Sequence, residues 1–568
     1  MELEIAILTN SIVFSAAVEK LEAGTITLKL DDPQPVALFG FSSTARFAIE
    51  ASPMNGMGDY KALWHFLTGD VRRKALVLNE KRPGVDESAA LPVPLGEMER
   101  RYPGVSSWLG EAWRAKDWFL LWGPPGTGKT SHAMRALVDE AMAVPGRRVL
   151  LLAYTYKATD KICEMLETRI RERNGEMYLR IGKVQKCDPV FRSRIPEEMH
   201  LANRDVVRET LDNTRIIVST VSTLGPSHAI CGLVKHFDLA IIDEASQLLD
   251  THVLPLFCAK RQDNQTGPLV DKFILIGDDK QLPAVVQQSE ITSRIEDQEL
   301  IRHGFRDCRE SFFARLKRIA GEDKSLCGML DTQFRMHPMI ADFCNEFFYD
   351  GKLKNGNAPR QVAGLPVARE DATPFERYVL GTRLGFFPVE EGRRGGGKTS
   401  EAEARLCVDI VKTLLAGENR PNTEDPNGAP MKYESKDIGI IVPFRNQIAC
   451  VRKWIAEKLG PEADAAIVVD TVERYQGGER PVIIFSTVIS SSDQADWISA
   501  KRYDDDDDGD ELDVEIDRKL NVAITRSQER FYLVGNERVL NNLRAYGDLL
   551  RWITDHSGFC EHDATELF

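Results

Sequence analysis

The sequence predicts an α/β protein with two α/β domains, and three observations lead to that prediction. Short, continuous apolar runs recur from about residue 117 to the C-terminal part of the chain. Amphipathic stretches typical of helices lie between several of these runs, which is the pattern of parallel sheets covered by helices on both faces. The runs are spread over roughly 420 residues, which suits two domains better than one.

Eight of these runs are expected to be strands, because each is apolar and ends in polar or glycine residues. They are Trp118–Trp122, Val149–Ala153, Ile216–Val218, Leu239–Ile242, Phe273–Ile276, Ile438–Val442, Val482–Phe485 and Phe531–Val534.

The composition is that of an ordinary globular protein and excludes several other classes. Of the 568 residues, 43% are hydrophobic and 28% are charged, so a wholly disordered, collagen-like or fibrous chain is excluded. No apolar run approaches the roughly 18–20 residues that would cross a bilayer. The N-terminus is acidic and its apolar stretch is interrupted by polar residues, unlike a secretory signal. We therefore expect a cytoplasmic protein without a membrane partner.

The cysteines and the net charge exclude little else. None of the ten cysteines forms a CxxC pair, so a zinc ribbon or an iron–sulfur cluster would lack local ligands. The net charge of −14 would normally count against a nucleic-acid partner. Residues 504–517 hold ten carboxylates and no base, however, so the remainder is nearly neutral and can carry a basic groove. We expect the run Asp504–Asp508 to be a solvated loop rather than an element that repels nucleic acid or binds a basic partner.

The N-terminal part of the chain differs from the rest. Ile26, Leu28 and Leu30 alternate with other residues, as in a half-buried strand, and a helix is expected over Asp59–Leu76. The expected division is a β-rich accessory region (1–80), a proline-rich linker (81–104), a first α/β domain (105–328) with a helical insertion at about 171–213, a second α/β domain (329–556) and a tail (557–568).

A glycine-rich segment that fits GxxxxGK[ST] follows the first expected strand and precedes a helical stretch. It reads Gly123-Pro124-Pro125-Gly126-Thr127-Gly128-Lys129-Thr130. Its glycines would let backbone N–H groups turn inward around a phosphate. Lys129 would place a positive charge at the β- and γ-phosphates, and the Thr130 hydroxyl is a ligand suited to Mg²⁺. The segment therefore predicts a site for ATP and Mg²⁺.

A second segment, Gly392–Thr399, fits the same pattern and also precedes a helical stretch. Glu390 and Glu391 would place negative charge where a triphosphate must be held. No later expected strand ends in Asp or Glu that could hold a metal. We therefore expect only the first segment to bind nucleotide.

Two further segments place polar side chains directly after expected strands. Asp243 and Glu244 follow Leu239–Ile242, and this arrangement suits a carboxylate that holds Mg²⁺ beside one that deprotonates a water molecule. After the next strand, Gln281 is a neutral amide that could contact both the γ-phosphate and that water.

Six segments in order resemble the motifs of superfamily-1 helicases, over roughly residues 105–540. They are GPPGTGKT, DEASQ, GDDKQLP, LDTQFRMHP (330–338), VDTVERYQGGE (469–479) and LNVAITRS (520–527). The resemblance is to the 5′-to-3′ branch, in the subgroup of the nonsense-mediated-decay RNA helicase and the Okazaki-fragment nuclease-helicase. It implies two RecA-like P-loop NTPase domains with ATP in the cleft between them.

The resemblance also implies roles for residues of the second domain. Arg335 and Arg526 would reach across the cleft to the γ-phosphate, a task suited to a planar, always charged guanidinium. Phe334 would stack on the adenine, at a position where the family usually has Tyr. Glu479 would bind the ribose hydroxyls.

A single strand of DNA or RNA would cross both domains, held mostly through its phosphates. The residues that match the family's strand contacts are Thr155, Tyr156, Ser219, Thr220, Pro443, Arg445, Thr471 and Val472. For each of them, the alternative is a residue that only caps the end of a strand.

The expected function is an ATP-dependent helicase or translocase with 5′-to-3′ polarity. The alternative is an ATP-gated module that binds single strands, or that regulates a partner nuclease, without processive unwinding. The family usually places a glutamine before the phosphate loop to read adenine, and this chain has none between Gln34 and Gln185. We therefore expect no strict specificity for adenine, so that other nucleoside triphosphates could also be hydrolysed.

Overall fold

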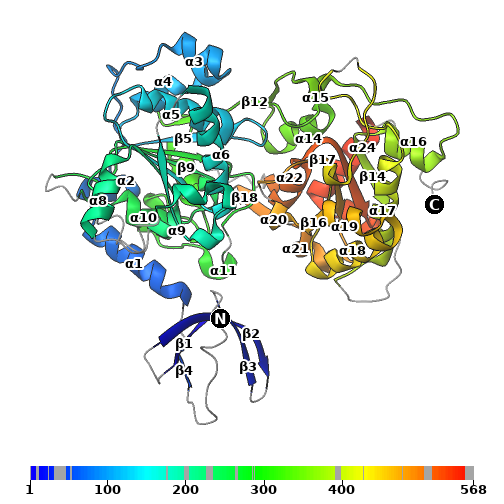
Figure 1. The fold of residues 1–568 in the computed structure, drawn as a ribbon, viewed down its shortest axis with the longest axis horizontal. Coiled ribbons are helices and arrows are strands. Elements are labelled where there is room, and N and C mark those ends of the chain that lie inside the picture. Colours follow the sequence, from blue (N-terminus) through cyan, green and yellow to red (C-terminus); the bar gives the residue numbers. More distant parts are fainter. Residues whose placement is uncertain are drawn as a thin grey trace.

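The chain forms two α/β lobes and a small N-terminal sheet, as the computed structural model in Figure 1 shows. The structure describes residues 2–7, 12–22, 25–30, 47–50, 54–173, 177–196, 204–224, 234–261, 266–284, 286, 288, 290–389, 398–425, 428–475, 477–499, 501–504 and 514–556. Within these ranges no helix has the length and apolar character needed to span a membrane.

The first lobe holds a seven-stranded sheet in the order β11-β5-β10-β9-β6-β8-β7, and every pair in it is parallel. Its strands are β5 (Trp118–Trp122), β6 (Val149–Ala153), β7 (Tyr178–Ile181), β8 (Ile216–Thr220), β9 (Leu239–Asp243), β10 (Phe273–Gly277) and β11 (Cys327–Met329). Its helices are α1 (Met54–Thr68), α2 (Val71–Val77), α3 (Leu95–Arg101), α4 (Leu109–Arg114), α5 (Arg135–Met142), α6 (Tyr156–Arg173), α8 (Arg204–Asn213), α9 (Val221–Leu224), α10 (Asp250–Phe257), α11 (Glu290–Ser293), α12 (Gln298–Arg302) and α13 (Phe312–Ala320).

The second lobe holds a five-stranded parallel sheet in the order β14-β20-β17-β15-β16. Its strands are β14 (Leu384–Pro388), β15 (Ile438–Val442), β16 (Val468–Thr471), β17 (Arg480–Ser486) and β20 (Ser527–Gly535). Its helices are α14 (Pro338–Phe348), α15 (Pro359–Val362), α16 (Pro374–Gly381), α17 (Glu401–Leu415), α18 (Arg445–Leu459), α19 (Pro461–Ala466), α20 (Val472–Tyr475), α21 (Ala495–Ile498), α22 (Arg518–Ile524), α23 (Glu537–Asn541) and α24 (Arg544–His556). Two short ladders pair β12 (Thr332–Gln333) with β13 (Lys354–Asn355) and β18 (Lys501–Asp504) with β19 (Val514–Asp517).

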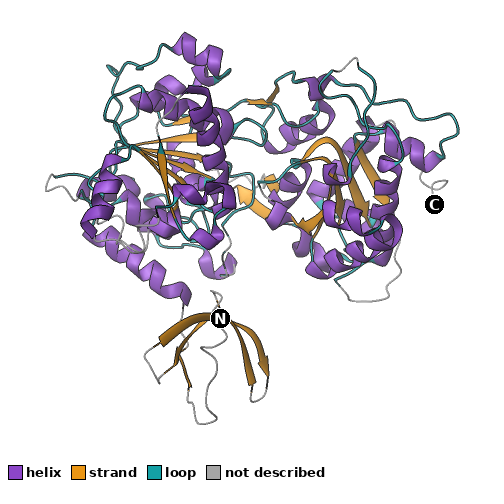
Figure 2. Ribbon diagram, in the orientation of Figure 1, coloured by secondary structure: helices purple, strands orange, loops and turns teal. Residues whose placement is uncertain are grey.

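Helices cover both sheets on both faces, as Figure 2 shows, and this explains why the strands are apolar throughout. Along β5, Phe119 and Leu121 enter one core, whereas Leu120 and Trp122 enter the core on the opposite face. Because the side chains of a strand point alternately to the two faces, a strand buried on both sides cannot show the alternation of a half-buried strand. The two α/β domains predicted from the sequence are thus confirmed.

The N-terminal strands form a separate antiparallel sheet in the order β3-β2-β1-β4 (Figure 1). They are β1 (Glu2–Ile7), β2 (Ile12–Glu22), β3 (Thr25–Leu30) and β4 (Phe47–Glu50). The helix expected over Asp59–Leu76 is instead two helices, α1 and α2. The chain breaks at Gly69, where an added Cβ would lie 2.6 Å from the carbonyl oxygen of Cys258. Asp70 then begins α2 by accepting a hydrogen bond from the Arg73 N–H at 3.0 Å.

The domain boundaries expected from the sequence differ from the structure in two places. Helix α1 packs against α10 of the first lobe through buried Ala62, so it does not belong with the N-terminal strands. The segment expected as a helical insertion, about 171–213, contributes the edge strand β7. Arg180 interrupts the apolar pattern of β7, and the structure buries it in an ion pair with Asp160.

Candidate nucleotide site and nucleic-acid groove

The glycine-rich segment forms a tight loop between β5 and a helix. Gly126 and Gly128 have φ angles of +78° and +76°, a conformation that side chains disfavour. The Nζ atom of Lys129 donates a hydrogen bond to the Gly123 carbonyl at 2.6 Å. A π-helical turn, Lys129–Met134, follows and leads into α5. The loop therefore presents Lys129 and the first backbone N–H groups of a helix together, which suits an anion.

The carboxylates that follow β9 lie beside this loop. The Thr130 hydroxyl donates to Oδ2 of Asp243 at 2.6 Å, so the two oxygen ligands expected for a metal converge. Glu244 has a φ angle of +53°, which is uncommon for a residue with a side chain. Burial, followed by the negative charge of Asp243, raises the pKa of Glu244 to about 7. Hard oxygen donors of this kind fit Mg²⁺.

Gln281 and Arg526 join the two lobes at the same site. The Nη2 atom of Arg526 donates to Oε1 of Gln281 at 3.2 Å, and Nε2 of Gln281 donates to Oδ2 of Asp278 at 2.7 Å. Arg526 is only 2% exposed. Burial, followed by repulsion from Arg335, lowers the pKa of the Arg526 guanidinium to about 9.

Arg335 also reaches the phosphate loop from the second lobe. An added Cβ at Gly126 would lie 2.6 Å from Cβ of Arg335, and the N–H of Phe334 donates to the Gly126 carbonyl at 2.9 Å. The Phe334 ring lies over Gly356 and remains 38% exposed. Glu479 pairs with Arg335, its Oε2 lying 2.5 Å from Nε. The loop and the segment 334–335 are therefore in direct contact.

Four cations thus gather around the phosphate loop. Burial lowers the pKa of Lys129 and of Lys161, and for both of them repulsion from Arg335 and Arg526 contributes to the decrease. Like charges held this close destabilise one another, and a bound anion would offset that repulsion. Carboxylates such as Asp278 offset part of this repulsion, and the remaining cations suit the site to an anion.

A groove with a volume of about 570 Å³ lies on the second lobe. It lies at the carboxyl ends of β15 and β16, and three residues matched to strand contacts line it: Pro443, Arg445 and Thr471. The others are Lys398, Phe444, Asn446, Glu473 and Arg474. Lys398 stands 5.4 Å above the centre of the Phe444 ring. The groove thus combines cations, a hydroxyl and an aromatic ring.

Lys398 comes from the second glycine-rich segment. Residues 390–397 of that segment lie outside the described part of the chain, whereas Lys398 lines the groove of the second lobe. Ser400 then caps α17 by accepting a hydrogen bond from the Glu403 N–H at 3.1 Å.

The side chains of three of the residues matched to strand contacts are buried, which leaves mainly their backbone groups to meet a strand. Ser219, Thr220 and Val472 are at most 2% exposed. The Ser219 hydroxyl donates to the Ile181 carbonyl at 3.0 Å, because β7 covers β8 at this point. These side chains satisfy polar groups or pack at the ends of strands. Thr155 and Tyr156 are half-buried at the start of α6.

Comparisons with known proteins agree with the order of the motifs. Two family models, each described as an AAA domain, match residues 189–289 and 308–538. The "DNA replication ATP-dependent helicase/nuclease DNA2" of Homo sapiens is 29% identical over 451 residues, which cover 75% of this chain and 36% of that protein. The "Putative helicase mov-10-B.1" of Danio rerio is 26% identical over 476 residues, covering 79% of this chain and 42% of that protein. The chain belongs to the superfamily-1 helicases.

The chain spans well under half of the length of those relatives. A solved structure, "Complex structure of Arterivirus nonstructural protein 10 (helicase) with DNA", aligns with a TM-score of 0.37 at 12% identity, covering 96% of this chain and 78% of that one.

The candidate site includes residues that the sequence did not single out. Asp278, Tyr349 and Asn521 form a buried chain of hydrogen bonds across the lobes: Tyr349 donates to Asp278 at 2.8 Å, and Asn521 donates to Tyr349 at 2.9 Å. Lys161 of α6 donates to the carbonyl of Gly477 in the second lobe. Asp278 and Asn521 fall inside motif segments, so the motifs could have pointed to them. No sequence pattern pointed to Lys161.

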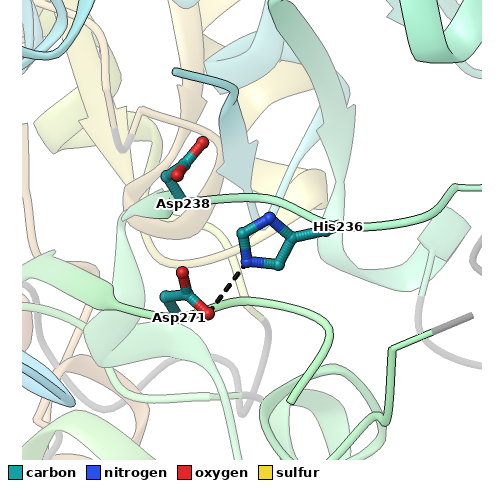
Figure 3. A group of neighbouring side chains, drawn as sticks. All are labelled: His236, Asp238 and Asp271. Atoms are coloured by element: carbon teal, nitrogen blue, oxygen red, sulfur yellow. Dashed lines mark ion pairs between the residues drawn. The ribbon is translucent and has the colours of Figure 1, made fainter. Parts of the chain in front are cut away.

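A second cluster of polar residues lies at the amino-terminal ends of β9 and β10 in the first lobe (Figure 3). His236, Asp238 and Asp271 stand where the chain enters β9 and β10, and their donor atoms lie within 4.8 Å of one another. Nε2 of His236 lies 2.8 Å from Asp271, and Asp238 accepts the Arg148 N–H at 2.7 Å. These contacts hold the entries of neighbouring strands together. Because the phosphate loop follows the carboxyl end of β5, this cluster is remote from it.

Proposed function

We propose that the chain is a nucleic-acid-stimulated ATPase that moves 5′-to-3′ along single-stranded DNA or RNA and separates duplexes. One observation carries this proposal: cations from both lobes converge on the phosphate loop, and a half-buried carboxylate, Glu244, lies among them. A triphosphate bound there would be held by both lobes at once. Hydrolysis, followed by release of inorganic phosphate, would remove the charge that draws them together.

The residues around the loop have separate tasks in this mechanism. Lys129 and the loop N–H groups bind the phosphates, while Arg335 and Arg526 stabilise the negative charge that develops during transfer. Glu244 accepts a proton from the attacking water, and Gln281 orients that water. A carboxyl whose pKa lies near 7 is well matched to proton transfer at neutral pH. Phe334 stacks on the base, and Glu479 accepts the ribose hydroxyls after its pairing with Arg335 is relieved.

Mg²⁺ fits this site because Thr130 and Asp243 present converging oxygen donors. The ion would supply charge neutralisation for the phosphates. The remaining steps depend on the side chains described above.

The strand would follow the groove of the second lobe and cross to the start of α6. Arg445, Thr471 and backbone groups near Pro443 would hold phosphates, and Thr155 and Tyr156 would do so on the first lobe. Such contacts do not read bases, so the proposed substrate is defined by its single-stranded backbone. The 5′-to-3′ polarity follows the subgroup that the motifs resemble.

The deciding experiment measures ATP hydrolysis with no polymer, with single-stranded DNA and with single-stranded RNA in parallel. We expect at least one polymer to stimulate turnover and Lys129→Ala to abolish it. Turnover that is equal in all three conditions would contradict the proposal. Unwinding of a duplex with a 5′ single-stranded tail then separates a helicase from an ATP-gated clamp or a regulator of a partner nuclease, because only the helicase releases product strands.

A further inference from the structure

Lys161 is the one residue of α6 for which the described contacts include a hydrogen bond to the second lobe. Its Nζ atom donates to the carbonyl of Gly477, in the loop between α20 and β17. An added Cβ at Gly477 would lie 3.6 Å from this Nζ atom and 3.6 Å from Oε1 of Glu244. The contact between the lobes therefore lies directly beside the carboxylate proposed to activate water.

Lys161 is exposed overall, but its ammonium lies among charges of both signs at the cleft. Burial and repulsion from Arg335 and Arg526 lower its pKa, while Glu244 and Glu479 act in the opposite direction. A lysine on a solvated helix face can avoid such repulsion by turning its flexible side chain toward water. Here the ammonium instead extends across the cleft to a backbone oxygen.

Each side of this contact is connected to a segment proposed to bind the strand. Helix α6 begins at Tyr156, five residues before Lys161 and therefore about 7.5 Å away along a rigid helix. In the second lobe, Thr471 lines the groove, and the short helix α20 leads from it to Gly477. Movement of either strand-binding segment would therefore be transmitted to the Lys161–Gly477 contact.

We propose that Lys161 is a positioning residue that couples strand binding to ATP hydrolysis. A strand that spans α6 and the groove brings the two segments together, and Lys161 then holds the Gly477–Glu479 loop against the first lobe. This places the loop beside Glu244 and keeps Arg335 and Arg526 at the phosphates. The inference rests on the proposed function and adds the route by which the polymer stimulates turnover.

The other contacts between the lobes do not provide this route. Arg526 meets Gln281, and Tyr349 meets Asp278, in the segment that follows β10 rather than on α6. In the proposed function these contacts lie at the nucleotide, whereas the contact of Lys161 lies between the two segments proposed to bind the strand.

The test compares Lys161→Met and Lys161→Arg with a control on the same helix, Arg171→Ala. Arg171 is exposed near the end of α6 and bonds only within that helix among the contacts described for it. We measure the ratio of turnover with and without single strand. We expect Lys161→Met to lower this ratio at least tenfold, Lys161→Arg to restore at least half of it, and Arg171→Ala to leave it unchanged. A ratio in Lys161→Met equal to that of the wild type would overturn the coupling role.

A second readout separates failure of this inference from failure of the proposed function. Strand affinity is measured with and without a non-hydrolysable ATP analogue, since the change is the coupling between the two sites and needs no turnover. We expect the analogue to change wild-type strand affinity, and Lys161→Met to lose most of that change. If the wild-type protein hydrolyses no ATP, the proposed function fails, and this readout alone decides the role of Lys161. If neither ligand changes the affinity for the other in the wild type, the coupling role is excluded.

Discussion

Arg526 of the second lobe donates a hydrogen bond to Gln281 of the first lobe at 3.2 Å, and both side chains are buried. The bond connects a guanidinium proposed to contact the γ-phosphate with an amide proposed to orient water. Each lobe thus places one side chain at the same point of the candidate site. The two side chains should act as one unit during hydrolysis.

This relationship predicts that mutations at the two positions are not additive. Arg526→Ala should lower turnover about 10³-fold, the scale of an arginine that stabilises phosphoryl transfer. Gln281→Ala should also lower turnover, and the double mutant should be hardly slower than Arg526→Ala, because residues in contact share their effect. Arg526→Lys should recover little, since an ammonium lacks the planar fork of donors. Losses that simply multiply would show that the two residues act independently.

Glu244→Gln should separate hydrolysis from nucleotide binding. The amide fills the same space but cannot accept a proton, so turnover should fall by about 10²- to 10⁴-fold. Nucleotide affinity should be retained or increased, because the substitution removes a negative charge near the phosphates. Turnover and the affinity for a fluorescent ATP analogue are measured together. Glu164→Gln, on the exposed face of α6, is the matched control. Loss of nucleotide binding in Glu244→Gln would argue against a role limited to the water.

The sequence predicted the strands of the two sheets best where both faces are buried. Each of the eight apolar runs is part of a strand. The edge strand β7 was not predicted because Arg180 interrupts it, and the buried arginine is paired there with Asp160. Strand β16 was not predicted for a similar reason, since its sequence Val-Val-Asp-Thr is half polar. Strands at sheet edges thus depend on partners that are distant in sequence.

In the candidate site, too, some features could be predicted from local sequence and others depend on residues distant in sequence. Motif segments predicted which residues would surround the phosphate loop, because their chemistry requires those residue types. Burial of Ser219 depends on β7 covering its hydroxyl, and the contact of Lys161 depends on how the lobes are placed. Neither arrangement has a local sequence pattern. The roles assigned to the site residues stay predictions for the experiments described here.

Lys272 should make the stability of the first lobe depend on pH. Burial, followed by repulsion from Arg147, lowers the pKa of Lys272 from 10.5 to about 7, while its ammonium donates to the Trp113 carbonyl at 2.7 Å. Between these two values the unfolded chain binds more protons than the folded chain, so stability should rise with pH. Below about pH 7 both states are protonated, so stability no longer changes with pH through this group and the full cost of burying the ammonium is present.

The measurement is the midpoint of urea unfolding for the wild type and Lys272→Met at pH 6, 7.5 and 9. The difference between the two proteins should favour Lys272→Met most at pH 6 and should shrink as the pH rises. Lys235→Met, at an exposed lysine of the same lobe, should show no such trend. A difference that does not vary with pH would mean that Lys272 keeps its ordinary pKa.

Phe334 should set the affinity for the nucleobase. Its ring is held over Gly356 and partly exposed beside the phosphate loop, a position suited to stacking. Phe334→Ala should weaken ATP binding about tenfold or more, since stacking of a base on an aromatic ring contributes roughly 1–3 kcal/mol. Phe334→Tyr keeps the ring and should bind as the wild type does. Because every base has a stacking face, Phe334→Ala should weaken ATP, GTP and CTP similarly. A loss confined to ATP would indicate that another residue reads adenine.

The groove on the second lobe should bind the strand through a countable number of phosphates. Lys398→Ala and Arg445→Ala each remove one cation from its lining. Each should reduce the slope of log affinity against log salt by about 0.7, the value for one phosphate contact on a single strand. The change should be the same for DNA and RNA of different sequences, because phosphates carry no sequence information. Arg171→Ala, far from the groove, should leave the slope unchanged. If Lys398→Ala weakens binding equally at all salt concentrations, Lys398 acts on the Phe444 ring beneath it rather than on a phosphate.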